Sequence, residues 1–281
     1  MSRWFHNGEA ASLVSIDDRA FQYGDGLFET IAIRDGEPRL WEYHMDRLAM
    51  GCGRMRIMVP DIQNLRQKLD DAVERSHENP AHCAAKIVIS SGVSARGYAR
   101  KNPTDAKSYI GVFATLPVSV EHYRSGVETR VCSTRLAVFS VTAGLKTLNR
   151  LEQVLARSES VDHSAFEGLT LDADERLICG TMSNVFIVSN HSLITPSLHR
   201  CGVEGVMRRH AIETLRDNGI VVEVRDVDVA ELYGSDEVFL TNSQFGVLPV
   251  RRCGEKVWRV HPVTREVMSK MANNGIAECA V

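Results

Sequence analysis

The chain has 281 residues, is 44% hydrophobic and carries a formal net charge of −3. This length and composition allow a sizeable core, in one large domain or two smaller ones. The mixed charges leave no basic stripe, which argues against nucleic acid as a partner. No apolar run approaches the roughly 18 residues that a membrane span needs, so a membrane protein is excluded too.

The cysteines and the N-terminus indicate the compartment. The seven cysteines have irregular spacing, so we expect free thiols in a reducing environment, with neither a disulfide framework nor a metal site. They are Cys52, Cys83, Cys132, Cys179, Cys201, Cys253 and Cys279. The first eight residues lack the apolar segment of a signal peptide. We therefore expect a soluble, cytoplasmic protein.

The first part of the chain alternates strands and helices. The turn-forming pairs Asn7-Gly8 and Asp35-Gly36 predict two hairpins. Helical spacing of apolar residues predicts helices over Leu40–Met55 and Ile62–Ser76. The apolar run Lys86–Ser90 then predicts a buried strand.

A change of composition over Thr115–Glu121 predicts an interdomain linker, because Pro117 in this stretch disfavours helix. After it, a helix is predicted from Val206 to Asn218, between Gly205 and Gly219. The strand candidates of this half are Glu167–Asp172, Arg176–Cys179, Ser183–Val188, Val221–Arg225 and Glu237–Thr241. The order is mixed α/β, without the repeated βαβ rhythm of a doubly wound sheet.

Lys146 is predicted to stand at the start of an amphipathic helix. Leu148, Leu151 and Leu155 fall on one helical face, with Val154 beside them. A partly desolvated lysine loses some of its preference for the charged form, and the neutral amine can form a Schiff base with an aldehyde. The simpler alternative is a solvated lysine at a helix start.

The segment Gly144–Leu155 resembles the lysine segment of the aminodeoxychorismate lyases. These are fold-type IV pyridoxal-phosphate (PLP) enzymes, related to D-amino-acid and branched-chain aminotransferases. Further segments match in the same order: Tyr23–Thr30, His44–Leu48, Gly180–Phe186, Cys201–Arg208 and Thr241–Gly246. The resemblance implies a smaller N-terminal α/β domain over residues 1–115, a linker over 116–121 and a larger PLP-binding domain over 122–281, with the cofactor between the domains.

The same resemblance implies how PLP is held. Lys146 forms the Schiff base, the backbone N–H groups of Val206 and Met207 bind the phosphate, and Arg47 supplies positive charge. The other cofactor-binding residues implied are Ser183, Asn184, Thr241, Asn242 and Ser243. Helix N-termini and arginine both suit a phosphate dianion. For Arg47 the alternative is a surface salt bridge with Asp46 or Glu42.

Cys179 departs from the family pattern. The family usually has a glutamate immediately before the Gly-Thr-x-Ser-Asn segment, where it holds a proton on the pyridine nitrogen. A neutral thiol cannot stabilise a pyridinium, so the electron sink of the cofactor should be shallower. Two interpretations remain open: a lyase that tolerates the change because its reaction ends in an aromatic ring, or a weakened or repurposed relative.

The expected reaction is conversion of 4-amino-4-deoxychorismate to 4-aminobenzoate and pyruvate. The resemblance gives Thr30 a catalytic part beside Lys146, although a threonine also suits a strand on β-propensity alone. Arg96 and Tyr98, in an Arg-Gly-Tyr loop, and Asn242 are expected to contact the substrate. Ser90-Ser91-Gly92 stands where family members often carry an arginine. A D-amino-acid or branched-chain aminotransferase is the alternative, and the family implies a homodimer.

Overall fold

The chain folds into two compact units. The first comprises Met1–Leu116 and Leu145–Asn149, and the second comprises Pro117–Gly144 and Arg150–Val281. The computed structural model describes residues 3–94, 96–100, 104–115, 118–138, 141–159 and 165–281. Each unit combines strands and helices, so the predicted mixed α/β class is confirmed.

The first unit is built on a six-stranded antiparallel sheet in the order β2-β1-β6-β5-β3-β4. Its strands are β1 (Arg3–His6), β2 (Glu9–Ala10), β3 (Gly26–Arg34), β4 (Glu37–Pro38), β5 (His82–Ser90) and β6 (Lys107–Ala114). Its helices are α1 (Arg19–Tyr23), α2 (Trp41–Met55) and α3 (Ile62–Ser76). Both predicted hairpins and both predicted helices are present.

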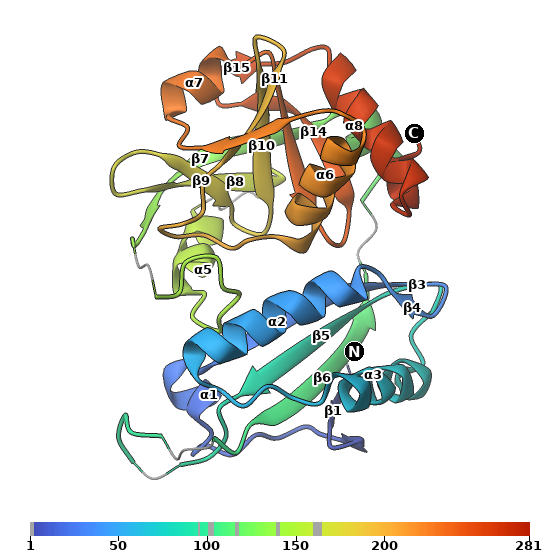
Figure 1. The fold of residues 1–281 in the computed structure, drawn as a ribbon, viewed down its shortest axis with the longest axis vertical. Coiled ribbons are helices and arrows are strands. Elements are labelled where there is room, and N and C mark those ends of the chain that lie inside the picture. Colours follow the sequence, from blue (N-terminus) through green and yellow to red (C-terminus); the bar gives the residue numbers. More distant parts are fainter. Residues whose placement is uncertain (1–2, 95, 101–103, 116–117, 139–140, 160–164) are drawn as a thin grey trace. The chain divides into compact units, whose positions relative to one another are not determined.

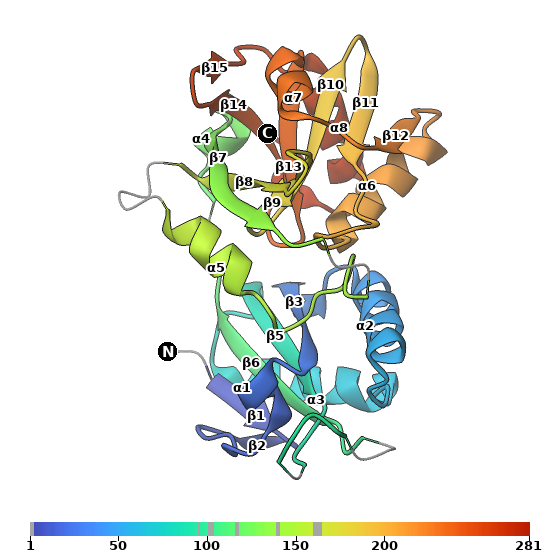
Figure 2. The ribbon, with the colours of Figure 1, turned by 90° about the vertical axis from the view of Figure 1, so that its left-hand side faces the viewer.

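Helices α2 and α3 cover one face of this sheet (Figures 1 and 2). The core between them contains Leu48 and Leu69 from the helices and Ile31 and Ile87 from the strands, all almost fully buried. Because side chains alternate along a strand, the residues between these point to the opposite face. On that face of β3 lie Phe28 and Thr30, both half-buried; we call it the open face.

The second unit contains a nine-stranded mixed sheet in the order β12-β11-β10-β13-β14-β7-β8-β9, with β15 added beside β14. Its strands are β7 (Val127–Leu136), β8 (Glu167–Asp172), β9 (Leu177–Gly180), β10 (Asn184–Ser189), β11 (Ser192–Pro196), β12 (Val222–Arg225), β13 (Glu237–Asn242), β14 (Gly246–Cys253) and β15 (Lys256–Val257). The five strand candidates of the second half are therefore confirmed to within one residue at each end.

The helices of the second unit are α4 (Val120–Ser125), α5 (Leu151–Ser158), α6 (Val206–Asp217), α7 (Val229–Gly234) and α8 (Pro262–Asn273), with a short 3₁₀ helix at Ala277–Cys279. Helices α6 and α8 pack side by side and against β13 (Figure 1). The stacked rings of Phe186 and Phe239, 4.8 Å apart, mark the centre of the core.

Two sequence predictions need correction. Helix α5 begins at Leu151, so Lys146 lies five residues before it, in a non-helical segment, and does not stand at its first turn. The supposed core face of that helix is open, since Leu151, Val154 and Leu155 are each more than half exposed. The second correction concerns the linker, because α4 already begins at Val120; residues 116 and 117 lie outside the described part.

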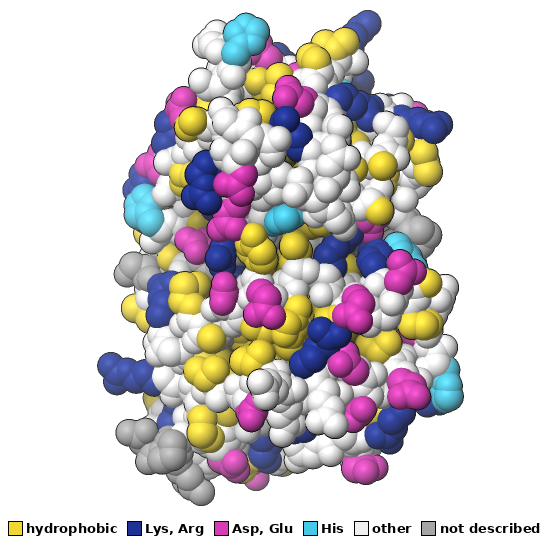
Figure 3. Space-filling model, turned by 45° about the vertical axis from the view of Figure 1, so that its right-hand side comes forward, with side chains coloured by type: hydrophobic (Ala, Val, Ile, Leu, Met, Phe, Trp, Pro, Cys, Tyr) yellow, Lys and Arg dark blue, Asp and Glu magenta, His cyan; other side chains and the backbone are white. Residues whose placement is uncertain are grey.

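The cysteines and the charged side chains can be located in the structure. All seven cysteines are buried free thiols. Within the described ranges, no group of side chains could hold a metal ion and no helix is long and apolar enough to cross a membrane. On the face in Figure 3, basic and acidic side chains are interspersed and form no single-sign field.

Candidate functional site

The backbone of Lys146 is fixed against the first strand residues of β3. The N–H of Phe28 donates to the Lys146 carbonyl at 3.0 Å, and the N–H of Leu148 donates to the Gly26 carbonyl at 3.0 Å. Leu145, fully buried in the core of the first unit, anchors the segment from inside. The lysine is therefore held by an extended, hydrogen-bonded segment and not by a helix.

The Lys146 amine lies on the open face. Its Nζ is 4.2 Å from the centroid of the Phe28 ring, and the Nζ of Lys86 is 4.5 Å from the same centroid. Lys86 is the cross-strand partner of Thr30, so this threonine, both lysines and the phenylalanine form one cluster. Burial lowers the pKa of Lys86. The amines of Lys146 and Lys86 thus lie beside the apolar ring of Phe28, on the sheet face that also carries the Thr30 hydroxyl.

Arg47 lies on the helix-covered side of the same sheet. Its Nε donates to Oε1 of Glu29 at 2.9 Å, and Nη2 contacts Oε2 of the same carboxylate. His44 Nδ1 is 2.6 Å from Oε2 of Glu29. Burial alone would raise the pKa of Glu29, but the charge of Arg47 and the hydrogen bond from His44 lower it to about 2. The salt bridge of Arg47 with Glu29 is therefore buried and does not lie on the surface. The phosphate role of Arg47 remains a prediction.

Arg96 and Tyr98 lie in the loop between β5 and β6. Both side chains are exposed, Tyr98 by 88%. The ring of Tyr98 approaches that of Tyr23, with centroids 5.6 Å apart. Gly97 between them has φ +110°, a conformation that favours glycine. The loop thus presents an arginine and a phenol to its surroundings, as a substrate-binding loop must.

In the second unit, the N-terminus of α6, which we call the cradle, follows a glycine N-cap. Gly205 is its N-cap, and no side chain caps the helix. In the described part of the chain, no hydrogen bond uses the N–H groups of Val206 and Met207. Helix N-termini with open N–H groups favour negative charge through these donors and the helix dipole. The phosphate contact of these two N–H groups stays a prediction.

Asn184 and Thr241 adjoin this cradle. They are paired residues of β10 and β13, and Asn184 Nδ2 donates to the Val203 carbonyl at 2.9 Å. A Cβ on Gly205 would stand 2.0 Å from Oδ1 of Asn184, so only glycine fits there. Among the residues that the structure describes, the buried Thr241 hydroxyl has no hydrogen-bond partner. A buried hydroxyl of this kind is available to bond with a ligand atom.

Glu167 organises the turn that leads to Asn184. Its buried carboxylate accepts from the N–H of Thr181 at 3.1 Å and of Met182 at 3.2 Å, and from the Ser183 hydroxyl at 2.6 Å. The Thr181 hydroxyl donates to it as well, at 2.5 Å. Asn242 Nδ2 donates to the Met182 carbonyl. A fully satisfied carboxylate of this kind fixes a turn more firmly than backbone bonds alone.

Cys179 is fully enclosed on β9. Burial raises the pKa of its thiol, which is therefore neutral. The Thr170 hydroxyl lies 3.6 Å from Sγ, and the Arg150 guanidinium is near enough to act on it electrostatically. A neutral thiol stands where the family pattern has an acid.

Each unit therefore gathers a part of the predicted site. Lys146 and Thr30 lie together in the first unit, while the second unit brings together the α6 N-terminus, Ser183, Asn184, Thr241 and Asn242. Sequence analysis missed Lys86 and Glu167. Lys86 could have been found from the strand period, because it shares a face with Val88 and opposes Thr30. No motif distinguishes Glu167, since the turn residues that it holds, Thr181 and Ser183, lie 14 and 16 residues away.

Residues 26–253 of the chain match the model of a protein family that is described as "Amino-transferase class IV". The chain belongs to this family. The aminodeoxychorismate lyase of Vibrio harveyi is 36% identical to it over 245 residues, which cover 87% of this chain and 89% of that protein. These matches confirm the resemblance found in the sequence.

Solved structures of the family share the fold. The 4-amino-4-deoxychorismate lyase from Pseudomonas aeruginosa superposes with a TM-score of 0.88 at 42% identity, covering 97% of this chain and 99% of that one. A hypothetical aminotransferase from Mycobacterium tuberculosis in its PLP-bound form gives a TM-score of 0.81 at 20% identity, with 99% and 100% covered. The fold-type IV architecture is thereby confirmed.

Proposed function

We propose that this protein is an aminodeoxychorismate lyase that converts 4-amino-4-deoxychorismate to 4-aminobenzoate and pyruvate with PLP as cofactor. The observation that carries the proposal is the placement of the Lys146 amine against Phe28, on the same sheet face as Thr30. A nucleophilic lysine needs such a partly apolar environment to reach its neutral form. The lyase relatives at 36% and 42% identity support the choice of reaction.

The residues of the second unit fit PLP. The open N–H groups of Val206 and Met207 and the unpartnered Thr241 hydroxyl would bind its phosphate. Asn184 and the Glu167-bound turn would support the ring, with Cys179 facing the pyridine nitrogen. Ser243 and Arg47 would complete the phosphate contacts. When bound, PLP supplies an aldehyde for the substrate amine and a ring that accepts electrons.

The protein's own groups then carry the proton transfers. The Lys146 amine removes the proton from ring C4 of the substrate as general base. The Thr30 hydroxyl, next to it on the open face, donates a proton toward the oxygen of the departing enolpyruvate. The C–O bond breaks, the ring becomes aromatic, and enolpyruvate tautomerises to pyruvate.

Cations of the first unit would hold the two carboxylates of the substrate. Lys86 lies beside Thr30 on the open face, and Arg96 is exposed in the neighbouring loop. Asn242 and Tyr98 would add hydrogen bonds. Guanidinium and ammonium groups provide the charge-assisted bonds that carboxylates require. No arginine is needed at Ser90–Gly92 if Lys86 takes that part.

The lyase assignment is tested by supplying PLP and 4-amino-4-deoxychorismate and measuring 4-aminobenzoate and pyruvate. We expect equimolar products, and a loss of at least about 10³-fold in Lys146→Ala because base and cofactor anchor are removed together. Lys68→Ala, a change at a half-buried position of α3, is the control and should retain full activity. Substantial turnover by Lys146→Ala would contradict the assignment.

The main alternative is an aminotransferase, as the family description allows. Formation of pyridoxamine phosphate on addition of D-amino or branched-chain amino acids would reveal it. A protein that binds PLP but turns over neither class of amine would be a weakened relative, with Cys179 as the first suspect.

We also propose a cytoplasmic homodimer. Leu151, Val154 and Leu155 form an exposed apolar face on α5, which a second copy would cover. Seven free thiols suit the reducing cytoplasm.

A further inference from the structure

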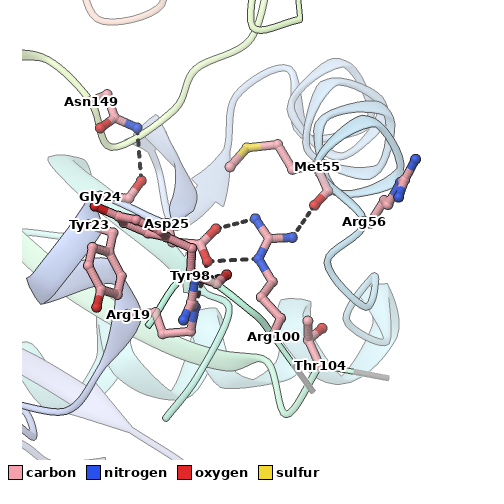
Figure 4. Close-up of a pocket in the computed structure, with 10 residues that line it drawn as sticks. All are labelled: Arg19, Tyr23, Gly24, Asp25, Met55, Arg56, Tyr98, Arg100, Thr104 and Asn149. Carbon is pink, nitrogen blue, oxygen red and sulfur yellow. Dashed lines mark hydrogen bonds and ion pairs between the residues drawn. The ribbon is translucent and has the colours of Figure 1, made fainter. Parts of the chain in front are cut away.

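A buried ion cluster lies beneath the loop that carries Arg96 and Tyr98. Arg19, the first residue of α1, and Asp25 have side chains only 6% and 7% exposed, and Nε of Arg19 donates to Oδ2 of Asp25 at 2.8 Å. Figure 4 shows this pair in the wall of a cavity of about 550 Å³. Neither Lys146 nor Thr30 lines this cavity, so the cluster has no direct part in the chemistry.

The rest of the Arg19 guanidinium is used on the loop. Nη1 donates to the Ser94 hydroxyl at 3.0 Å and to the Gly97 carbonyl at 2.9 Å, and Nη2 donates to the Tyr98 carbonyl at 3.0 Å. The backbone N–H of Arg19 also bonds the Gly92 carbonyl at 3.0 Å. One side chain thus holds the loop on both sides of Arg96.

Asp25 fixes the guanidinium of Arg19. Besides Arg19, it accepts from Ser91 Oγ at 2.7 Å and from Nε of Arg100 at 2.8 Å, while Nη2 of Arg100 contacts its other oxygen. Burial would raise the pKa of Asp25, but the hydrogen bonds from Arg100, Arg19 and Ser91 lower it overall. The carboxylate therefore stays ionised and joins α1 to both ends of the loop.

The local sequence explains why the two side chains meet. Asp18 caps α1 by accepting from the N–H of Ala20, and the helix ends after one turn at Gly24. Gly24 has φ +63°, and this conformation turns the backbone back toward the start of α1. The N–H of Asp25 therefore donates to the Arg19 carbonyl at 3.2 Å. A left-handed residue at this place favours glycine. The helix thereby sets Asp25 beside Arg19.

We propose that Arg19, held by Asp25, is a positioning residue that sets the conformation of the Arg96–Tyr98 loop and through it the recognition of the substrate carboxylates. The planar fork of arginine is required, because one group must reach a carboxylate and three loop acceptors in different directions. A lysine has the charge but not this geometry. The proposal rests on the proposed function for the role of Arg96, but the loop itself can be tested without it.

The first test is limited digestion with trypsin, which cuts after Arg96 when the loop opens. Cleavage of a transiently opened segment follows the population of its open form. We expect Arg19→Lys and Asp25→Asn to increase the cleavage rate at Arg96 by about tenfold or more, corresponding to one lost charge-assisted contact. Arg56→Ala is the control, because it removes a cation that lines the same cavity. The Arg56 side chain makes no hydrogen bond within the described residues, so this variant should be cleaved at the same rate as the unmodified protein.

The second test is kinetic. Arg19→Lys should raise KM for 4-amino-4-deoxychorismate by about tenfold with little change in kcat, because it weakens binding and leaves the reacting groups in place. In an Arg96→Ala background the same change should add little, since coupled residues are non-additive. Arg56→Ala is again the control.

The outcomes separate the two proposals. Unchanged cleavage at Arg96 in Arg19→Lys would overturn the positioning role. A rise in cleavage at all sites alike, with a lower melting temperature, would also overturn it, because the effect would then be on overall stability. Faster cleavage at Arg96 with unchanged KM would support the role of Arg19 in holding the loop. It would also show that Arg96 does not take part in substrate recognition, which would overturn that part of the proposal. Absence of lyase activity in every variant would reject the proposed function while the digestion result still stands.

Discussion

At the scale of single residues, three buried carboxylates of this protein are each surrounded by hydrogen-bond donors. Glu29, Asp25 and Glu167 are each nine-tenths buried or more, and each accepts several hydrogen bonds. Isolated buried carboxylates are costly, so such groups persist only with donors around them. The motif Tyr23–Thr30 contains Asp25 and Glu29 but does not reveal their partners, such as Arg100 and Arg47, which lie outside it.

Glu29 should make stability depend on acid pH. Its pKa is about 2 in the folded protein and 4.5 without the fold, a difference of about 3 kcal/mol. A carboxyl group whose pKa is lowered by folding stabilises the folded state at pH values above its pKa in the unfolded chain. This contribution of Glu29 is lost as the pH falls from 4.5 toward 2. We expect the stability advantage over Glu29→Gln, measured by urea unfolding between roughly pH 6 and 3, to shrink on acidification. A constant difference across that range would contradict this assignment.

Cys179 offers a direct test of the cofactor ring contact. Cys179→Glu would place a carboxylate near the buried Arg150 guanidinium, whose charge can stabilise it. We expect a changed visible absorption of bound PLP and tighter cofactor binding by equilibrium dialysis, because an acid can hold the pyridine proton. Cys179→Ser, which is of similar size and neutral, should leave both unchanged. Equal spectra for all three proteins would show that this position does not reach the ring.

At the scale of elements, periodicity predicted helices and strands well where local packing decides them. Helix α3 has the predicted bounds, and α2 begins one residue later than predicted. Helix α5 shows the limit, because its apolar spacing is real but its side chains are not buried within the chain. The Lys146 segment is extended because strand β3 offers it hydrogen bonds, and no local propensity contains that information.

The open face of α5 leads to a test of the homodimer. Leu155→Glu would put a charge on an apolar surface that a second copy is proposed to cover, at a cost of several kcal/mol. We expect the sedimentation behaviour of a dimer for the unmodified protein and of a monomer for the variant. Gln67→Glu, which adds the same charge at an exposed position of α3, is the control. A monomeric unmodified protein would reject the proposal.

At the scale of the whole molecule, the sequence motifs established the family, and the matches over residues 26–253 confirm it. The chain order of the motifs gave no information on which unit each residue joins. Leu145–Asn149 belongs with the first unit although its neighbours on both sides belong with the second. A division of the chain at a single linker would assign Leu145–Asn149 to the second unit, whereas the chain returns to the first unit over these residues. Only the contacts of Leu145 and Phe28 reveal it.

This return has a consequence for synthesis on the ribosome. When residues 1–116 have emerged, the first unit still lacks Leu145, a fully buried part of its core, and the carbonyl that the N–H of Phe28 requires. Domains usually fold as units while translation proceeds from the N-terminus. Here the first unit can only be completed after about thirty residues of the second have been made. Lys146 therefore reaches its place beside Phe28 in the same step in which Leu145 completes the core of the first unit.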